Sequence, residues 1–264
     1  MKQKEQYGQG KSENTSLSKT LAILSTFDEN TPIQRTSDIA ARLGLNISTV
    51  SRHLNTLLDW GFVERDAVTG AYFPGIAIVA IAGAALQSKD CYRYAYPELQ
   101  RLSMQCKVHG HMGVPRGTDI VHLISSSCEK TMDLIIPMGH RHPMYCSAMG
   151  RAVLAYLPAS KVQEIIKKSE LLKLSEETKI DPEEIKQELV RTRQKGYCVL
   201  INELIDGQGS IAAPIFDRNR NPLAAISVSA SENRLCDPAQ EKLLAKHVLA
   251  AATRISSKMG YYPR

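Results

Sequence analysis

The chain has 264 residues, of which 43% are hydrophobic and 23% are charged, a composition that excludes an intrinsically disordered protein. A chain of this length is long for one domain and sufficient for two. No apolar run approaches the ~20 residues that span a bilayer, and residues 1–11 lack the apolar core of a signal peptide. We therefore expect a cytoplasmic protein with no membrane partner.

The net charge of +6 favours an acidic partner, but its distribution along the chain is uneven. Residues 1–75 contain eight Lys and Arg and eight Asp and Glu, which leaves 25 basic and 19 acidic residues in 76–264. The six cysteines form no Cys-x-x-Cys motif, and we expect reduced, mostly buried thiols. Bulk charge therefore does not predict nucleic-acid binding, and the placement of individual side chains must decide.

The sequence of the N-terminal part predicts a mobile arm over 1–15 and a winged helix-turn-helix domain over 16–75. Apolar spacing predicts a helix over 17–27, capped by Ser16, with Leu17, Leu21 and Leu24 facing inward. Two more helices are expected over 36–43 and 46–60, each followed by a glycine. Strands over 62–66 and 71–73, joined by a turn at 68–70, would form the wing.

The sequence of the remaining chain predicts a linker helix over 76–89 and an α+β effector domain over 90–264 with a mostly antiparallel sheet. The pattern predicts helices over 92–106, 147–157, 182–195 and 239–259. It predicts strands over 108–114, 119–125, 131–136, 197–201, 210–216 and 223–229.

The helix over 46–60 has the features of a recognition helix that enters the DNA major groove. Val50, Leu54 and Leu57 would pack inward, and no acidic residue lies between Asp38 and Asp59 to repel phosphates. We expect its exposed residues to contact bases and phosphates, residues near helix starts to bind phosphates, and the wing tip to follow the backbone. The expected DNA-binding residues are Lys19, Thr36, Ser37, Ile47, Ser48, Thr49, Ser51, Arg52, Asn55, Thr69 and Gly70.

The chain resembles the IclR family of bacterial regulators from Leu17 to Gly260. The N-terminal segments that carry the resemblance are Ser18–Leu24, Leu45–Leu54, Gly61–Arg65 and Thr69–Tyr72. The C-terminal segments are Tyr145–Ala152, Gly196–Tyr197, Ile211–Asp217 and Ala225–Ser229. The resemblance implies a GAF-like effector domain that binds a small molecule between the sheet and its loops. It also implies a homodimer on operator DNA, with a dimer of dimers as the alternative assembly.

The resemblance implies that ligand contacts come from one loop and two strands. The expected effector-binding residues are Cys146, Ser147, Ala148, Met149, Gly150, Glu203, Ser210, Ser227 and Ser229. The residues themselves agree, because Ser227 and Ser229 are two apart on a strand and share a face. Ser147 begins a helix, where free backbone N–H groups attract a carboxylate. These features predict a small organic acid as the effector.

One position departs from the family pattern. Leu200 stands where an acidic residue often follows the Gly-Tyr pair, and Glu203 is the nearest acid. The run from Met144 to Ser147 resembles members that sense sugar acids, while an aromatic acid remains open.

The sequence leaves a metal site and an enzyme as alternatives. Five of the seven histidines (His109, His111, His122, His140 and His142) lie within 34 positions, and Cys106 with His109 and His111 suggests zinc ligands. No spacing supplies a fourth ligand, so we expect no metal and no cofactor. Cys146 and Ser147 near histidines suggest a nucleophile, but catalytic motifs are missing, and we expect no enzyme and no catalytic residue.

Overall fold

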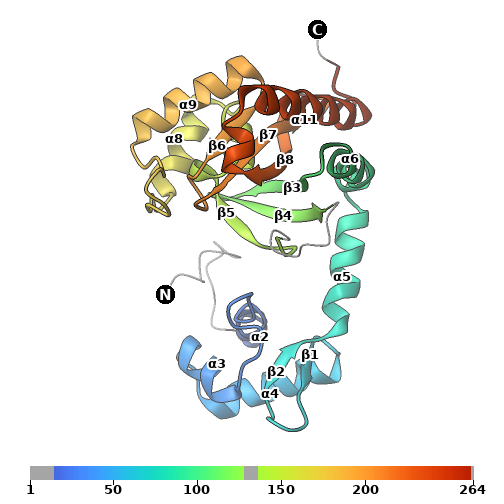
Figure 1. The fold of residues 1–264 in the computed structure, drawn as a ribbon. Helices are drawn as coiled ribbons and strands as arrows, with labels where there is room; N and C mark the ends of the chain where they lie inside the picture. Colours follow the sequence, from blue (N-terminus) through green and yellow to red (C-terminus); the bar gives the residue numbers. More distant parts are fainter. Residues whose placement is uncertain (1–14, 128–135, 263–264) are drawn as a thin grey trace. The chain divides into compact units, whose positions relative to one another are not determined.

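The computed structural model describes residues 15–127 and 136–262 (Figure 1). The fold divides between Ser88 and Lys89 into two compact units, which we describe separately. The arm expected over 1–15 and most of the strand expected over 131–136 lie outside the described residues. Within the described part of the chain, no helix combines the length and apolar character that crossing a bilayer requires.

From residue 15 onward, the N-terminal unit has three helices, a two-stranded antiparallel hairpin and a fourth helix (Figure 1). Their bounds are α2 (Ser16–Leu24), α3 (Thr36–Leu43), α4 (Ile47–Asp59), β1 (Val63–Arg65), β2 (Tyr72–Pro74) and α5 (Ile76–Gln87). Gly44 ends α3 in the left-handed conformation, with φ of 64°, which lets the chain turn tightly into α4. This is the expected winged helix-turn-helix.

The core of this unit differs from the expected one at α2. Ile23 is fully buried with Ile39, Val50 and Leu54, whereas Leu17 and Leu21 are exposed. The helix is also shorter than predicted, and the Thr15 side chain, rather than Ser16, accepts a hydrogen bond from the Ser18 N–H. The i, i+4 spacing of leucines was therefore a wrong guide to the inward face.

The C-terminal unit is built on a six-stranded antiparallel sheet with the order β5-β4-β3-β8-β7-β6. The strands are β3 (His109–Arg116), β4 (Asp119–Ser126), β5 (Arg141–Pro143), β6 (Cys198–Ile201), β7 (Gln208–Phe216) and β8 (Pro222–Ser231). The helices are α6 (Asp90–Cys106), η1 (Met144–Cys146, a 3₁₀ turn), α7 (Ala148–Leu154), α8 (Ala159–Lys168), α9 (Pro182–Lys195), α10 (Glu232–Leu235) and α11 (Pro238–Lys258).

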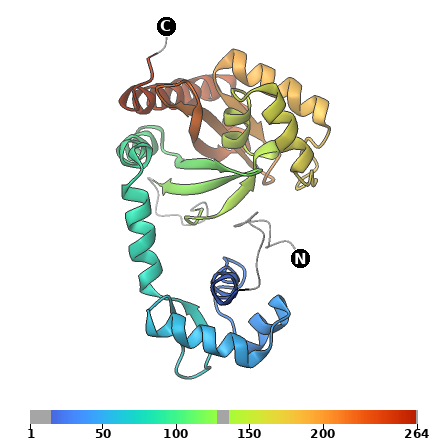
Figure 2. The same ribbon diagram turned by 180° about the vertical axis from the view of Figure 1, so that it is seen from behind.

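The two faces of the sheet carry different layers. On one face Met112, Ile226 and Val228 pack in an apolar cluster with residues of α6 and α11, which lie side by side (Figures 1 and 2). On the other face Ala212 and Ala225 pack with η1 and α7. Side chains alternate along each strand, so every strand contributes to both layers. The α+β class predicted from the sequence is confirmed.

Several elements were not predicted. The short strand β5 (Arg141–Pro143), which pairs with β4, was missed, while the expected strand 131–136 is described only at Ile136, which lies outside any strand. The 3₁₀ turn η1 and the helices α8 and α10 were missed. By contrast, α9 has the predicted bounds, because Asp181 caps its first turn and Gly196 ends it at a positive φ.

Candidate DNA-binding surface and ligand site

The exposed side of α4 carries most of the residues expected to contact DNA. Ile47, Ser48, Arg52 and Asn55 are exposed, while Thr49 and Ser51 are half-buried. Among the described residues, no side chain bonds or ion-pairs with the Arg52 guanidinium, so it is available to a base or a phosphate. The buried Val50, Leu54 and Leu57 hold the helix on the core. The polar side of the helix therefore needs no rearrangement to meet a partner.

His53 joins α4 to α2 and was missed in the sequence. Its Nδ1 lies 2.8 Å from the Thr20 hydroxyl, and that hydroxyl already donates to the Ser16 carbonyl, so the imidazole is the donor. Burial lowers the pKa of His53, and the positive charges of Arg52 and Lys19 lower it further. Lys19 therefore places its charge close to the recognition helix, where it was expected to bind phosphate.

The N-terminus of α3 carries the carboxylate of Asp38, a residue of its first turn. Asp38 accepts hydrogen bonds from the Arg35 N–H and from the Ser37 hydroxyl, both at 3.2 Å. Thr36 is half-buried and Ser37 is exposed. A phosphate at this helix start would have to approach beside the Asp38 carboxylate, which repels an anion. DNA contacts by Thr36 and Ser37 stay a prediction.

The wing tip is ordered by Asp66, another residue that sequence reasoning missed. Its Oδ1 accepts from the Thr69 N–H at 2.6 Å and from the Thr69 hydroxyl at 2.7 Å, and these bonds lower the pKa of the carboxyl. Arg65 donates to the Gly70 carbonyl and lies over the Tyr72 ring. The hydroxyl of Thr69 is thus committed to the turn, and Arg65 is the basic group beside the wing.

In the C-terminal unit, strand register places the expected ligand-binding serines in two adjacent rows on one face. One row runs Ser125, His111, Ser227, Ala212 across β4, β3, β8 and β7. The other runs His109, Ser229, Ser210, Leu200 across β3, β8, β7 and β6. We call these two rows the polar face.

The polar face lies on the side of the sheet that α7 covers. Gly113 shares the face of His109 and His111 by alternation, and a Cβ on Gly113 would lie 3.4 Å from the Met149 side chain. Within the second row, the Ser210 and Ser229 hydroxyls are 2.8 Å apart. The structure thus places Ser210, Ser227 and Ser229 on one face of the sheet, and Met149 in the helix that packs on that face.

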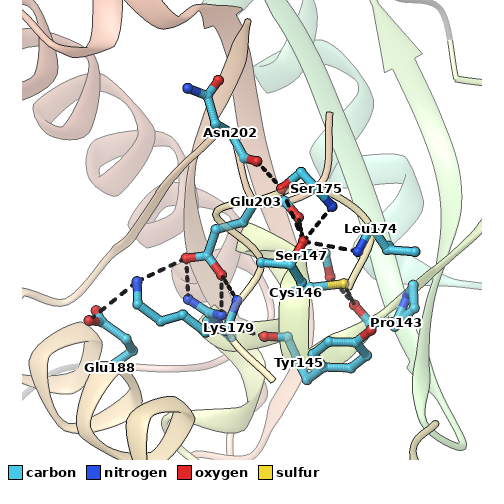
Figure 3. Close-up of polar contacts among 12 residues, drawn as sticks. Pro143, Tyr145, Cys146, Ser147, Leu174, Ser175, Lys179, Glu188, Asn202 and Glu203 are labelled. Carbon is cyan, nitrogen blue, oxygen red and sulfur yellow. Dashed lines mark hydrogen bonds and ion pairs between the residues drawn. The ribbon is translucent and has the colours of Figure 1, made fainter. Parts of the chain in front are cut away.

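The loop that enters α7 is tightly packed. The Ser147 hydroxyl donates to the Pro143 carbonyl at 2.7 Å (Figure 3), and the side chains of Cys146, Ala148 and Met149 are buried. A Cβ on Gly150 would lie 2.3 Å from the Met144 Cα, so only glycine allows α7 to lie against η1. Gly150 therefore has a packing reason to be glycine, independent of any ligand.

Glu203 forms a buried ion pair rather than an open lining group. Its carboxylate accepts from both terminal nitrogens of Arg151, at 2.8 and 2.5 Å, and both side chains are almost fully buried. The Lys179 ammonium lies 3.2 Å from Glu203 and 3.6 Å from Glu188 (Figure 3). Arg151 also donates to the Tyr145 carbonyl at 2.6 Å. The pair therefore fixes α7 and the preceding turn to the loop after β6.

The geometry gives little support to the two alternatives, a nucleophilic cysteine and a metal site. Burial raises the pKa of the Cys146 thiol to about 12, the opposite of what a nucleophilic cysteine needs. Cys106 packs in the cluster with α6 and α11, away from the face of His109 and His111. Residues 15–127 and 136–262 contain no group of three His, Cys, Asp or Glu side chains placed to hold a metal ion.

Comparison with known proteins accounts for both units. Residues 16–67 match the IclR helix-turn-helix domain, and residues 83–257 match the family described as bacterial transcriptional regulator IclR C-terminal. The HTH-type transcriptional regulator KipR of Bacillus subtilis is 29% identical over 94% of this chain and 98% of its own. The transcriptional repressor IclR of Escherichia coli is 30% identical over 84% of this chain and 82% of its own.

Solved structures show the same fold. An IclR homologue from Microbacterium hydrocarbonoxydans, crystallised in complex with 4-hydroxybenzoate, superimposes with a TM-score of 0.81 at 22% identity, covering 93% of this chain and 99% of that one. The helix-turn-helix unit and the effector unit therefore define a DNA-binding transcriptional regulator. The chain belongs to the IclR family.

Proposed function

We propose that this regulator binds operator DNA through α4 as a homodimer, and that a small organic acid bound in its C-terminal unit controls this binding. Residues 16–75 are the DNA-binding domain, residues 76–89 the linker helix and residues 90–264 the effector domain. The protein acts in the cytoplasm, where its DNA is. A dimer of dimers is the alternative assembly.

The observation that carries the proposal is the polar face. A sheet face that packs against a helix is usually filled with apolar side chains, yet here Ser210, Ser227 and Ser229 from two strands lie on the face that α7 packs against, together with histidines. Ligand sites combine apolar walls with a few placed polar groups of this kind. The homologue complexed with 4-hydroxybenzoate supports an acid as the ligand class.

The residues assigned to the effector fall into two groups. Ser210, Ser227, Ser229 and Met149 are proposed to contact the ligand, with Ser147 and Ala148 beside them at the start of α7. Cys146, Gly150 and Glu203 are proposed to hold the loop in place, because each is buried and already packed or hydrogen-bonded. We propose no catalytic role, because the Cys146 thiol is buried and its pKa is raised.

The test uses the full-length chain and DNA selected by it from a random duplex library. Fluorescence anisotropy then measures affinity for the selected DNA while D-gluconate, 4-hydroxybenzoate and further sugar and aromatic acids are added singly. At least one acid should change the DNA affinity about 10-fold or more, a typical allosteric coupling. Ser229→Ala should reduce that change, while Ser231→Ala, at the exposed end of β8, should leave it intact.

Selection of no DNA sequence would contradict the DNA-binding part of the proposal. Selected DNA whose binding no acid alters would contradict the sensing part.

A further inference from the structure

The polar face continues into a cluster of histidines that neither the DNA surface nor the serine contacts explain. His109 and His111 lie on β3, His122 on β4, His142 on β5 and His140 just before it. The His122 and His142 ring centroids are 4.9 Å apart, and those of His111 and His122 are 5.9 Å apart. His109, His111 and His122 are buried. The strands thus hold a continuous block of imidazoles beside Ser227 and Ser229.

Three buried nitrogens in this block have no hydrogen-bond partner among the described residues: His109 Nδ1, His111 Nε2 and His122 Nδ1. Buried polar atoms are almost always hydrogen-bonded, since an unsatisfied one costs about 1–3 kcal/mol. Three such atoms on one face beside the expected ligand residues therefore indicate a bound polar partner.

The hydrogen bonds around His111 fix its tautomer. The Ser125 hydroxyl donates its proton to the Ile136 carbonyl at 2.7 Å, so at 3.2 Å it accepts from His111 Nδ1. Burial lowers the pKa of His111 to about 3, so the ring is neutral at pH 7. With its proton on Nδ1, His111 presents a bare acceptor at Nε2.

Three further histidines, His122, His142 and His140, form a hydrogen-bonded chain. His122 Nε2 lies 3.0 Å from His142 Nδ1, and His142 Nε2 lies 2.9 Å from His140 Nε2. In neutral rings each bond needs one proton, so the direction of both bonds determines which nitrogen of His122 carries its proton. In one arrangement His122 Nδ1 is a donor, and in the other it is an acceptor.

We propose that His111 and His122 bind hydroxyl groups of the effector, so that the sensing site selects a polyhydroxylated acid of the sugar-acid class. This inference rests on the proposed acid-sensing function. A hydroxyl both donates and accepts, so it matches the fixed acceptor of His111 and either protonation of His122 Nδ1. Rings 5.9 Å apart suit one shared hydroxyl or two adjacent ones at ordinary N···O distances.

The surroundings favour hydroxyls over the other candidates. Arg141 is paired with Asp119 at 3.0 Å, and no described carboxylate bonds to the imidazoles. Among the described residues, the block also has no three side chains placed to hold a metal ion. An aromatic or aliphatic acid would leave the imidazole nitrogens without hydrogen bonds. The free-energy cost of these unsatisfied atoms is what allows a site built for hydroxyls to reject analogues that lack them.

Isothermal calorimetry on the full-length protein tests the inference with four probes that separate the two chemistries. D-gluconate carries hydroxyls and a carboxylate, D-glucitol only hydroxyls, hexanoate only a carboxylate, and 4-hydroxybenzoate an aromatic acid. D-gluconate should bind most tightly, and D-glucitol more tightly than hexanoate. Binding of D-glucitol but of no acid would support hydroxyl recognition and overturn acid sensing.

Two substitutions of one histidine keep the test independent of folding. His111→Asn retains a donor near the Nδ1 position and removes the Nε2 acceptor, so D-gluconate affinity should fall about 10-fold or more. His111→Gln places an amide near the Nε2 position and should retain more affinity than His111→Asn. His247→Asn, on α11, is the matched control and should bind like the unaltered protein.

Three results would overturn the inference. The first is 4-hydroxybenzoate or hexanoate binding as tightly as D-gluconate, which leaves acid sensing intact. The second is no binding of either hydroxylated probe, or unchanged D-gluconate affinity in both a folded His111→Asn and a folded His111→Phe variant. The third is stoichiometric zinc in the purified protein that disappears with His111→Asn.

Discussion

Arg151 shows how a single side chain determines what its neighbours do. A fully buried guanidinium needs a matching charge, and Glu203 supplies it in a bidentate pair. The sequence indicated Glu203 as a ligand contact because it is the nearest acid to Leu200. Nothing in the sequence identified Arg151 as buried, since arginine is rarely buried and its partner lies 52 positions away.

The buried pair makes a prediction about stability. Glu203→Gln should lower the free energy of unfolding by about 3–5 kcal/mol, because it leaves the Arg151 charge buried without its partner. Chemical denaturation measures this, and Glu183→Gln, in an exposed pair with Lys186 in the first turn of α9, should have a much smaller effect. A Glu203→Gln protein as stable as the unaltered one would mean that the Arg151 charge is compensated in another way.

Arg52 makes a prediction about DNA affinity at the same scale. Arg52→Ala should weaken binding to selected DNA by about 1–3 kcal/mol if its guanidinium contacts a base, and the loss should depend on sequence. Equal weakening on all sequences, with a smaller salt dependence, would indicate a phosphate contact instead. Arg191→Ala, on the exposed side of α9, is the control. Unchanged affinity would remove Arg52 from the DNA-binding surface.

Among the elements, those that carry their own local signals could be predicted from the sequence. Asp181, Pro182 and Gly196 mark both ends of α9, and Gly44 marks the turn before α4. By contrast, β5 has only three residues, and its place in the sheet depends on pairing with β4. The resemblance to the IclR family implied Ser210, Ser227 and Ser229 as ligand contacts, and the two-residue spacing of Ser227 and Ser229 placed these two on one face of a strand. The sequence could not predict that His109 lies beside Ser229 and His111 beside Ser227, because these neighbours depend on the register of β3 against β8.

The histidine block on β3, β4 and β5 predicts a pH dependence of stability. In the folded protein burial lowers the pKa of His111 to about 3, of His122 to about 2 and of His142 to about 4. In the unfolded chain these groups titrate near 6.5. Below pH 6.5 the unfolded chain therefore binds protons that the folded protein does not, and each histidine removes up to about 1.4 kcal/mol of stability per pH unit.

Denaturation of the full chain at pH 7.5, 6.5, 5.5 and 4.5 measures this effect. Trp60 is the only tryptophan, so its fluorescence follows the N-terminal unit, while near-ultraviolet circular dichroism of tyrosines mainly follows the other. The tyrosine transition should weaken steeply below pH 6.5, and His122→Phe should make that decline shallower. Equal stability of the C-terminal unit at pH 7.5 and 5.5 would contradict the prediction.

For the whole molecule, the contacts within one chain do not explain why α5 is apolar. None of its residues is buried, and Ile76, Val79 and Ile81 are 71%, 63% and 55% exposed. Exposed apolar side chains gathered on one short helix mark an interaction surface. In the homodimer proposed above, whose two α4 helices would lie about 34 Å apart on DNA, we expect α5 to supply a contact between the protomers.

We therefore expect Val79→Lys to shift the protein from dimer to monomer, measured by light scattering after size-exclusion chromatography. Its DNA affinity should fall with the dimer, because each half-site alone supplies only part of the contacts. Gln87→Lys, at the end of the same helix, controls for the added charge. A Val79→Lys protein that remains a dimer would place the interface elsewhere.

The two rows of the polar face also have an evolutionary consequence. Leu200, Ser210, Ser229 and His109 come from four strands, and each presents one side chain while its strand neighbours fill the core on the opposite face. A substitution at the half-buried Ser210 or Ser229 therefore changes the polar face without removing an apolar side chain from either core cluster. In the proposed sensing domain, such positions allow ligand preference to diverge between descendants one residue at a time.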